Sequence, residues 1–163
     1  MAYVITYPIL GTQPIATTET VQKHPLGLIV SGVDPVYGGG EFIYLSGVAS
    51  TVLGSWVTYN PDDFSTTLLA ANAIGPVGVA MSINVASQYG WYQISGKAIG
   101  KALAAFADNA NVYGTATAGS VDDAIVAGDR VQGCKGASAV DTPSAGLAEF
   151  EIARPFVNDA LAD

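Results

Sequence analysis

Charged side chains are scarce in this sequence: only 12% of its 163 residues are Asp, Glu, Lys or Arg, whereas 50% are hydrophobic. A soluble domain ordinarily carries about 25% charged residues, which keep it dispersed in water. The single cysteine, Cys134, excludes an internal disulfide framework and a zinc site built from several cysteines. No apolar stretch approaches the roughly 20 residues that a membrane-spanning helix needs. The sequence therefore predicts a soluble chain whose apolar surface is partly covered by other chains.

Basic residues are also few. Six Lys and Arg residues against fourteen Asp and Glu residues give a net charge of −8, and the six bases are scattered along the chain. Because affinity for phosphate backbones comes mainly from clustered Lys and Arg, we expect no nucleic-acid partner. Residues 1–10 contain no basic residue, and they have proline and tyrosine where a signal peptide would have a plain apolar run. We therefore expect synthesis in the cytoplasm without a cleaved signal, and no membrane partner.

Residues 1–35 are predicted to form an extended N-terminal arm. Several threonines and prolines, among them Pro8 and Pro14, disfavour a helix in this segment. Its tyrosines, isoleucines and valines distinguish it from a disordered tail, which is typically poor in such residues. We therefore expect the arm to dock, either on its own domain or on a neighbouring subunit.

Residues 36–163 are predicted to form a single β-rich domain. Short apolar stretches alternate there with turns rich in Gly, Pro, Asn and Asp, which is the pattern of consecutive β-strands. The expected fold is mainly β, a small β-barrel or β-sandwich with the extended arm and one or two short helical turns. The expected strands lie within residues 41–48, 56–59, 66–73, 77–83, 90–95, 111–117 and 147–152.

Two segments are ambiguous in secondary structure. Residues 97–107 (KAIGKALAAFA) could be a helix or could continue the strand before them, and Gly96 and Gly100 favour a strand over 97–103. Residues 120–127 (SVDDAIVA) read as a helical turn. Ser120 would cap it, the two aspartates would face its positive N-terminal dipole, and Gly128 would end it.

The residues that could carry chemistry each have an ordinary structural explanation. His24, the only histidine, lies in the arm and has no nucleophile near it in the sequence that would complete a triad. The acidic pair Asp62-Asp63 belongs to a turn that begins with Asn-Pro, and the pair Asp122-Asp123 belongs to the expected helical turn. The glycines at 38–40 lack the Lys-Ser/Thr of a phosphate-binding loop, and Cys134 lacks a histidine partner. We therefore predict a protein that is not an enzyme and that holds no cofactor or metal.

Tyr89, Trp91 and Tyr92 form the one dense aromatic group in the sequence. Such rings could stack on sugars, but Trp and Tyr also supply large contact areas with a polar tip in cores and subunit interfaces. We favour the core or interface interpretation.

Four segments of the sequence resemble small structural proteins of tailed bacteriophages. They are KHPLG at 23–27, GEFIYLSGVAST at 40–51, QYGWYQISG at 88–96 and AGDRV at 127–131. The resemblance is to capsid decoration proteins, also called cement proteins. It implies a β-barrel or β-sandwich that sits on the shell, often as a trimer, and that reaches neighbouring subunits with an extended terminus. It implies no catalytic residue.

The sequence thus predicts a non-enzymatic virion structural protein that binds the outer surface of the assembled capsid and stabilises it. The expected partners are the major capsid protein and further copies of this chain in a homotrimer. The alternative is a tail-associated or adsorption module that binds cell-surface carbohydrate, and a hydrolase using dispersed acids is a third class. The candidate capsid or subunit contacts are Tyr3, Ile5, Tyr7, Ile9, Leu10, Ile15 and Trp91.

Overall fold

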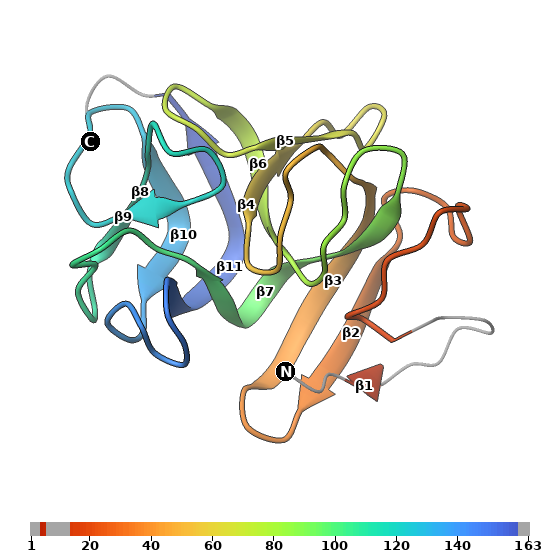
Figure 1. Ribbon diagram of the computed structural model, residues 1–163, viewed down its shortest axis with the longest axis horizontal. Coiled ribbons are helices and arrows are strands. Elements are labelled where there is room, and N and C mark those ends of the chain that lie inside the picture. Colours follow the sequence, from red (N-terminus) through yellow and green to blue (C-terminus); the bar gives the residue numbers. More distant parts are fainter. Residues whose placement is uncertain (1–3, 6–13, 160–163) are drawn as a thin grey trace.

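A computed structural model describes residues 4–5 and 14–159 of the chain, and every regular element in these ranges is a β-strand (Figure 1). The part of the chain so described therefore contains no helix that could cross a membrane. The strands are β1 (Val4–Ile5), β2 (Ile29–Asp34), β3 (Gly38–Ser46), β4 (Trp56–Tyr59), β5 (Thr66–Leu68), β6 (Ile74–Ala80), β7 (Tyr89–Lys101), β8 (Asn111–Gly114), β9 (Val121–Asp122), β10 (Arg130–Gly136) and β11 (Leu147–Asn158).

All strand pairs are antiparallel and belong to one sheet, in the order β1-β2-β3-β7-β6-β11-β10-β8-β9. Strand β4 branches from β6, and β5 pairs with β4. Over the described ranges no pairing joins β1 to β9, so the sheet is open. The expectation of a closed β-barrel, or of a sandwich of two separate sheets, is therefore wrong, although the mainly β class is confirmed.

The long strand β7 changes its partner at Gly96. Its first half pairs with β3, and residues 95–101 pair with β11. Gly96 has a φ of 98°, and a Cβ atom there would lie 2.3 Å from the carbonyl oxygen of Gly39, so only glycine fits this bend. Strand β6 pairs with both β7 and β11. The three strands β6, β7 and β11 therefore share a branch point in the sheet.

Buried side chains form three clusters on the two faces of this curved sheet. Along β3, Phe42 and Tyr44 enter one cluster, whereas Ile43 and Leu45 enter another. A strand buried on both faces reads as a continuous apolar run, as the stretch FIYL does. We call the first of these the aromatic cluster, and its buried members are Ile15, Val30, Phe42, Tyr44, Met81 and Trp91. The largest cluster lies between β4, β6, β7, β10 and β11.

The segment expected to be a helical turn, residues 120–127, contains strand β9 instead, so that prediction is wrong. Val121 is fully buried in the largest cluster, and its carbonyl oxygen accepts a hydrogen bond of 2.9 Å from the Leu103 amide. Tertiary packing of Val121 thus overrides the local helix signal. The strand interpretation of residues 97–103 is confirmed as far as Lys101, where β7 ends.

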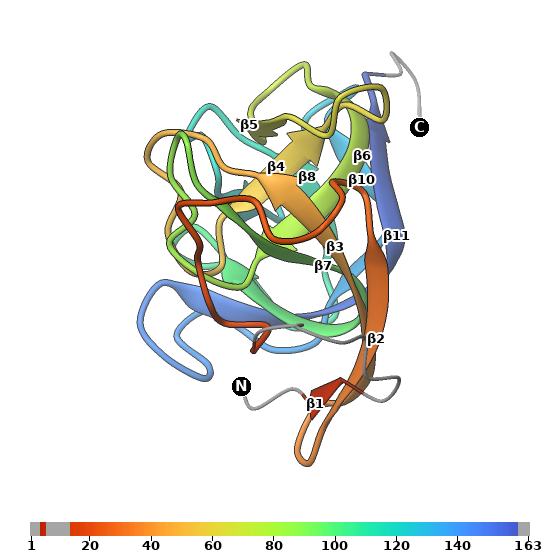
Figure 2. The same ribbon diagram turned by 90° about the vertical axis from the view of Figure 1, so that its right-hand side faces the viewer.

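The expected arm over residues 1–35 contains two strands. Strand β2 pairs along its length with β3, and β1 pairs with β2 opposite Gly32 and Val33. Figure 2 shows the β2–β3 hairpin along one side of the molecule, with β1 beside its lower end. Residues 14–28 lie between these strands in sequence and run over the aromatic cluster, to which Ile15 contributes a buried side chain. We call residues 14–28 the strap.

Candidate docking groove

An apolar groove of about 560 Å³ opens where four connecting segments meet β7 and β11. Ile99 of β7 and Leu147 of β11 contribute from the sheet. Leu53 and Ile83 project from two of the segments, and 49% and 61% of their surfaces are exposed. The remaining lining residues are Ala16, Thr18, Met81, Ser82, Pro143 and Ser144.

Gly54 fixes the segment that presents Leu53. Its amide donates to the Ala80 carbonyl at 2.9 Å, and its carbonyl accepts from the Lys101 amide at 2.8 Å. A Cβ atom at Gly54, whose φ is 80°, would lie 3.1 Å from Leu147 Cδ2. The backbone is therefore held against the sheet at Gly54, and the preceding Leu53 side chain remains open to solvent.

The strap lines the groove with Ala16 and Thr18. The Thr18 hydroxyl donates to Ser82 Oγ at 2.7 Å and lies 3.2 Å from the carbonyl oxygen of Ile83. One residue later, the backbones of Glu19 and Tyr89 exchange two hydrogen bonds of 2.9 and 2.8 Å. These contacts tie the strap to the loop that carries Met81, Ser82 and Ile83.

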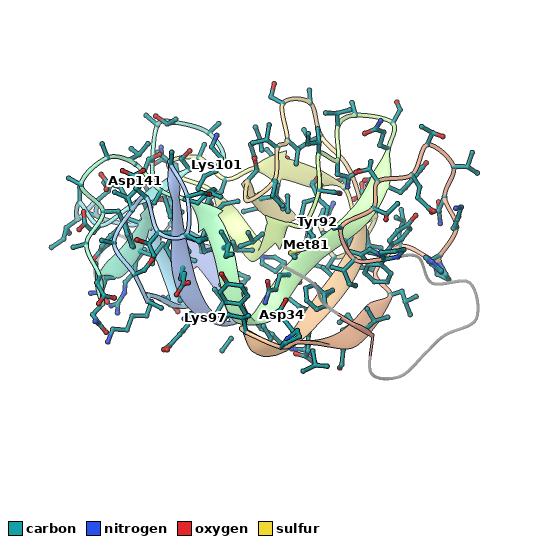
Figure 3. All side chains as sticks on the ribbon, turned by 60° about the horizontal axis from the view of Figure 1, so that its bottom comes forward. Asp34, Met81, Tyr92, Lys97, Lys101 and Asp141 are labelled. Atoms are coloured by element: carbon teal, nitrogen blue, oxygen red, sulfur yellow. The ribbon has the colours of Figure 1, made fainter. Side chains whose placement is uncertain are left out.

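The loop between β10 and β11 also lines the groove, with Pro143 and Ser144. The Asp141 carboxylate accepts a hydrogen bond of 2.7 Å from the Gly146 amide, which fixes the turn that contains Pro143 and Ser144. Figure 3 shows Asp141 and Lys101 toward the same end of the molecule, with Met81 nearer its middle. This agrees with the hydrogen bond of 3.1 Å from the Ala102 amide to the Gly146 carbonyl.

The aromatic group predicted from the sequence is divided between the two faces of the sheet. Trp91 is fully buried in the aromatic cluster, where its ring centroid lies 5.1 Å from that of Tyr44. Tyr92 is fully buried on the other face, where its hydroxyl accepts a hydrogen bond of 3.0 Å from Asn84 Nδ2. Burial raises the pKa of Tyr92 above its ordinary value. Neither ring has a face open to a sugar.

The predicted contact residues have different positions in the structure. Tyr3, Tyr7, Ile9 and Leu10 lie outside the described residues. Ile5 belongs to β1 and pairs with Gly32. Ile15 and Trp91 pack inside the chain's own aromatic cluster, so their side chains offer no area to another chain in this arrangement.

The other candidate residues make local contacts. His24 is buried with its ring edge-on to Tyr44, at 5.2 Å between centroids. Hydrogen bonds from Ser65 lower the pKa of Asp63, and Asp123 accepts a hydrogen bond of 2.9 Å from the Ala107 amide. Burial raises the pKa of the Cys134 thiol. Within residues 4–5 and 14–159, no group of three His, Cys, Asp or Glu side chains is placed to hold a metal ion.

Sequence reasoning missed the groove. Its lining residues lie between positions 16 and 147, so no local pattern connects them. The available signal was that Leu53 and Ile83 are apolar residues in segments flanked by turns, where polar residues are usual. Comparisons of the chain with protein-family models, with curated proteins and with solved structures give no match.

Proposed function

We propose that this chain is a non-enzymatic virion structural protein that binds the outer surface of an assembled capsid and stabilises it. The observation that carries the proposal is the open apolar groove, with Leu53 and Ile83 exposed at it, in a chain that has only 12% charged residues. Exposed apolar grooves on proteins mark sites of contact with other molecules. The resemblance to decoration proteins supports the choice of partner, which is the major capsid protein.

One groove of this size is too small to hold the protein on a capsid by itself. Fully burying a Leu or Ile side chain contributes about 1.5–3 kcal/mol, and Leu53 and Ile83 still expose about half of theirs. A stable interface buries about 1,600 Å² in total, far more than one groove provides. A homotrimer would present three grooves at once, and the avidity of linked sites would then supply the missing affinity.

The alternative function, carbohydrate binding, depended on the aromatic group Tyr89, Trp91 and Tyr92. A stacking platform needs exposed ring faces, whereas Trp91 and Tyr92 are fully buried. Tyr89 is only partly buried, but its ring is stacked on Tyr44 at 6.4 Å between centroids. We therefore propose no sugar-binding function.

The test is binding to capsid shells that lack this protein, measured by co-sedimentation and by electron microscopy of the shells. Leu53→Asp and Ile83→Asp are expected to weaken binding at least tenfold, because each places a charge at the apolar groove. Val36→Asp and Ile125→Asp are matched controls, since these side chains are 81% and 83% exposed and do not line the groove. Light scattering on the free protein is expected to show a trimer.

Equal binding by the groove variants and the wild type would refute the groove as the contact site. Absence of any binding by the wild-type protein would refute the proposed function itself. Circular dichroism of each variant checks that the fold is retained, which is expected because both groove side chains are already exposed.

A further inference from the structure

We propose that the strap, residues 14–28, detaches from the sheet as a unit. The ion pair between Glu19 and Lys23, which we call the latch, lies within the strap and keeps it closed by neutralising the Glu19 carboxylate that is buried against Tyr44 of β3. The strap forms one wall of the groove, so the consequence for docking rests on the proposed function. The opening of the strap itself can be measured in the free protein, without any partner.

The latch places a carboxylate in a nearly dry position. The Glu19 side chain is 5% exposed, and its Oε2 accepts a hydrogen bond of 3.3 Å from the Tyr44 hydroxyl. Its other oxygen forms an ion pair with Lys23 Nζ, whose side chain is 57% exposed. A buried carboxylate is strongly disfavoured without a compensating charge. The exposed lysine is therefore what permits Glu19 to stay buried.

Apart from Glu19, the strap has two buried side chains. They are Ile15 and His24, whose ring centroid lies 5.2 Å from that of Tyr44 and 5.8 Å from that of Trp91. Leu26 and Leu28 are only partly buried against the aromatic cluster. Residues 20–23 are exposed. Segments with few buried apolar contacts open at lower free energy than the core does.

The backbone contacts of the strap lie at the latch residues and near residue 28. Glu19 exchanges two hydrogen bonds with Tyr89, and the Lys23 amide donates to the Tyr44 hydroxyl at 3.4 Å. The Gly27 amide donates to the Tyr44 carbonyl at 2.8 Å, and the Leu28 carbonyl accepts from the Tyr44 amide at 2.9 Å. If the strap leaves as one unit, the amides of Glu19, Gly27 and Tyr89 lose their acceptors together. The contact of Thr18 with Ser82 is lost in the same step, so the groove loses its Ala16 and Thr18 wall.

This arrangement couples the strap to whatever occupies the groove. A partner that touches Ala16 or Thr18 binds the closed strap better than the open one, and it must shift the equilibrium toward the closed form. Conversely, a weakened latch lowers the apparent affinity of the groove by the fraction of molecules in which the strap is open.

The test is hydrogen exchange of the full-length protein, followed at the amides of residues 19, 27 and 89. In Lys23→Met the buried Glu19 charge loses its partner, so all three amides are expected to exchange at least tenfold faster and by a common factor. Adding Glu19→Gln to Lys23→Met removes the uncompensated charge. Exchange in the double variant is expected to return to within about threefold of the wild type.

Lys97→Met is the matched control. It breaks the ion pair of 2.6 Å with Glu149 on β11, away from the strap, and it should leave the three amides unchanged. The proposal is overturned if Lys23→Met has no effect, if the three amides respond by unrelated factors, or if the double variant exchanges faster than Lys23→Met alone. Capsid binding is measured separately. If the wild-type protein binds no shell, the proposed function is refuted, but the hydrogen-exchange result still decides whether the strap opens.

Discussion

The indole ring of Trp56 lies directly against the backbone of Gly100. A Cβ atom at Gly100 would stand 2.5 Å from Trp56 Nε1, and the same nitrogen donates a hydrogen bond of 3.2 Å to the Lys101 carbonyl. Trp56 is fully buried, and its ring meets Phe150 edge-to-face at 4.9 Å between centroids. This one side chain therefore connects β4 with β7 and β11 in the largest cluster.

Gly100→Ala is expected to destabilise the protein by about 1–3 kcal/mol, because the added methyl group overpacks a site with no free volume. Urea unfolding followed by tryptophan fluorescence measures the change. Gly39→Ala is the control, since no atom lies within 4 Å of a Cβ built there. A change for Gly100→Ala no larger than that of the control would contradict the close approach of Trp56.

Trp91→Ala is expected to lower the free energy of unfolding by about 3–5 kcal/mol, since it leaves a cavity in the aromatic cluster. The measurement is again denaturant unfolding. Val36→Ala, at an exposed turn position, should change stability by less than about 0.5 kcal/mol. A Trp91→Ala variant of wild-type stability would show that this ring is not part of the core.

The Cys134 thiol is expected to react slowly with thiol reagents in the folded protein and rapidly after denaturation. Burial against the largest cluster raises the pKa of this thiol above its ordinary value of 9.0, so the reactive thiolate is scarce in the native state. Labelling with and without denaturant at pH 8 measures the ratio. Native labelling as fast as that of the denatured protein would contradict the raised pKa of this partly buried thiol.

The same shift has a consequence for stability at alkaline pH. Above pH 9 the thiol ionises more readily in the unfolded chain than in the folded one, so unfolding becomes more favourable as the pH rises, by at most about 1.4 kcal/mol per pH unit. Below pH 9 both states keep the proton and the effect vanishes. The wild type should therefore lose stability relative to Cys134→Ala only above pH 9, and parallel pH profiles would contradict this.

The strands that the sequence predicts best combine apolar or β-branched residues with strong turn signals. Residues 56–59 form β4 with the expected bounds because Asn60 and Pro61 end the strand unambiguously. Strand β10 was missed because Gly133 and Gly136 interrupt its pattern. Gly133, at a φ of 70°, lies at a bulge between Gln132 and Cys134, which only the pairing with β11 makes visible.

The architecture and the groove depend on contacts that no local pattern encodes. The mainly β class follows from alternation and turns, but the branch point of β6, β7 and β11 depends on where β7 bends at Gly96. Likewise, the groove combines Leu53, Ile83 and Leu147, which are far apart in the sequence. Trp91 lies in the chain's own core, which is one of the two interpretations favoured from the sequence, whereas its role as a capsid or subunit contact stays a prediction.

Strand β11, residues 147–158, pairs with β10, β7 and β6. During translation, those three strands all leave the ribosome before their shared partner does. Until residue 158 has emerged, the nascent polypeptide must keep much of its apolar surface without its native neighbour, a condition that favours aggregation and slow, late folding. Brief protection by a chaperone over the synthesis of residues 74–158 would meet that need.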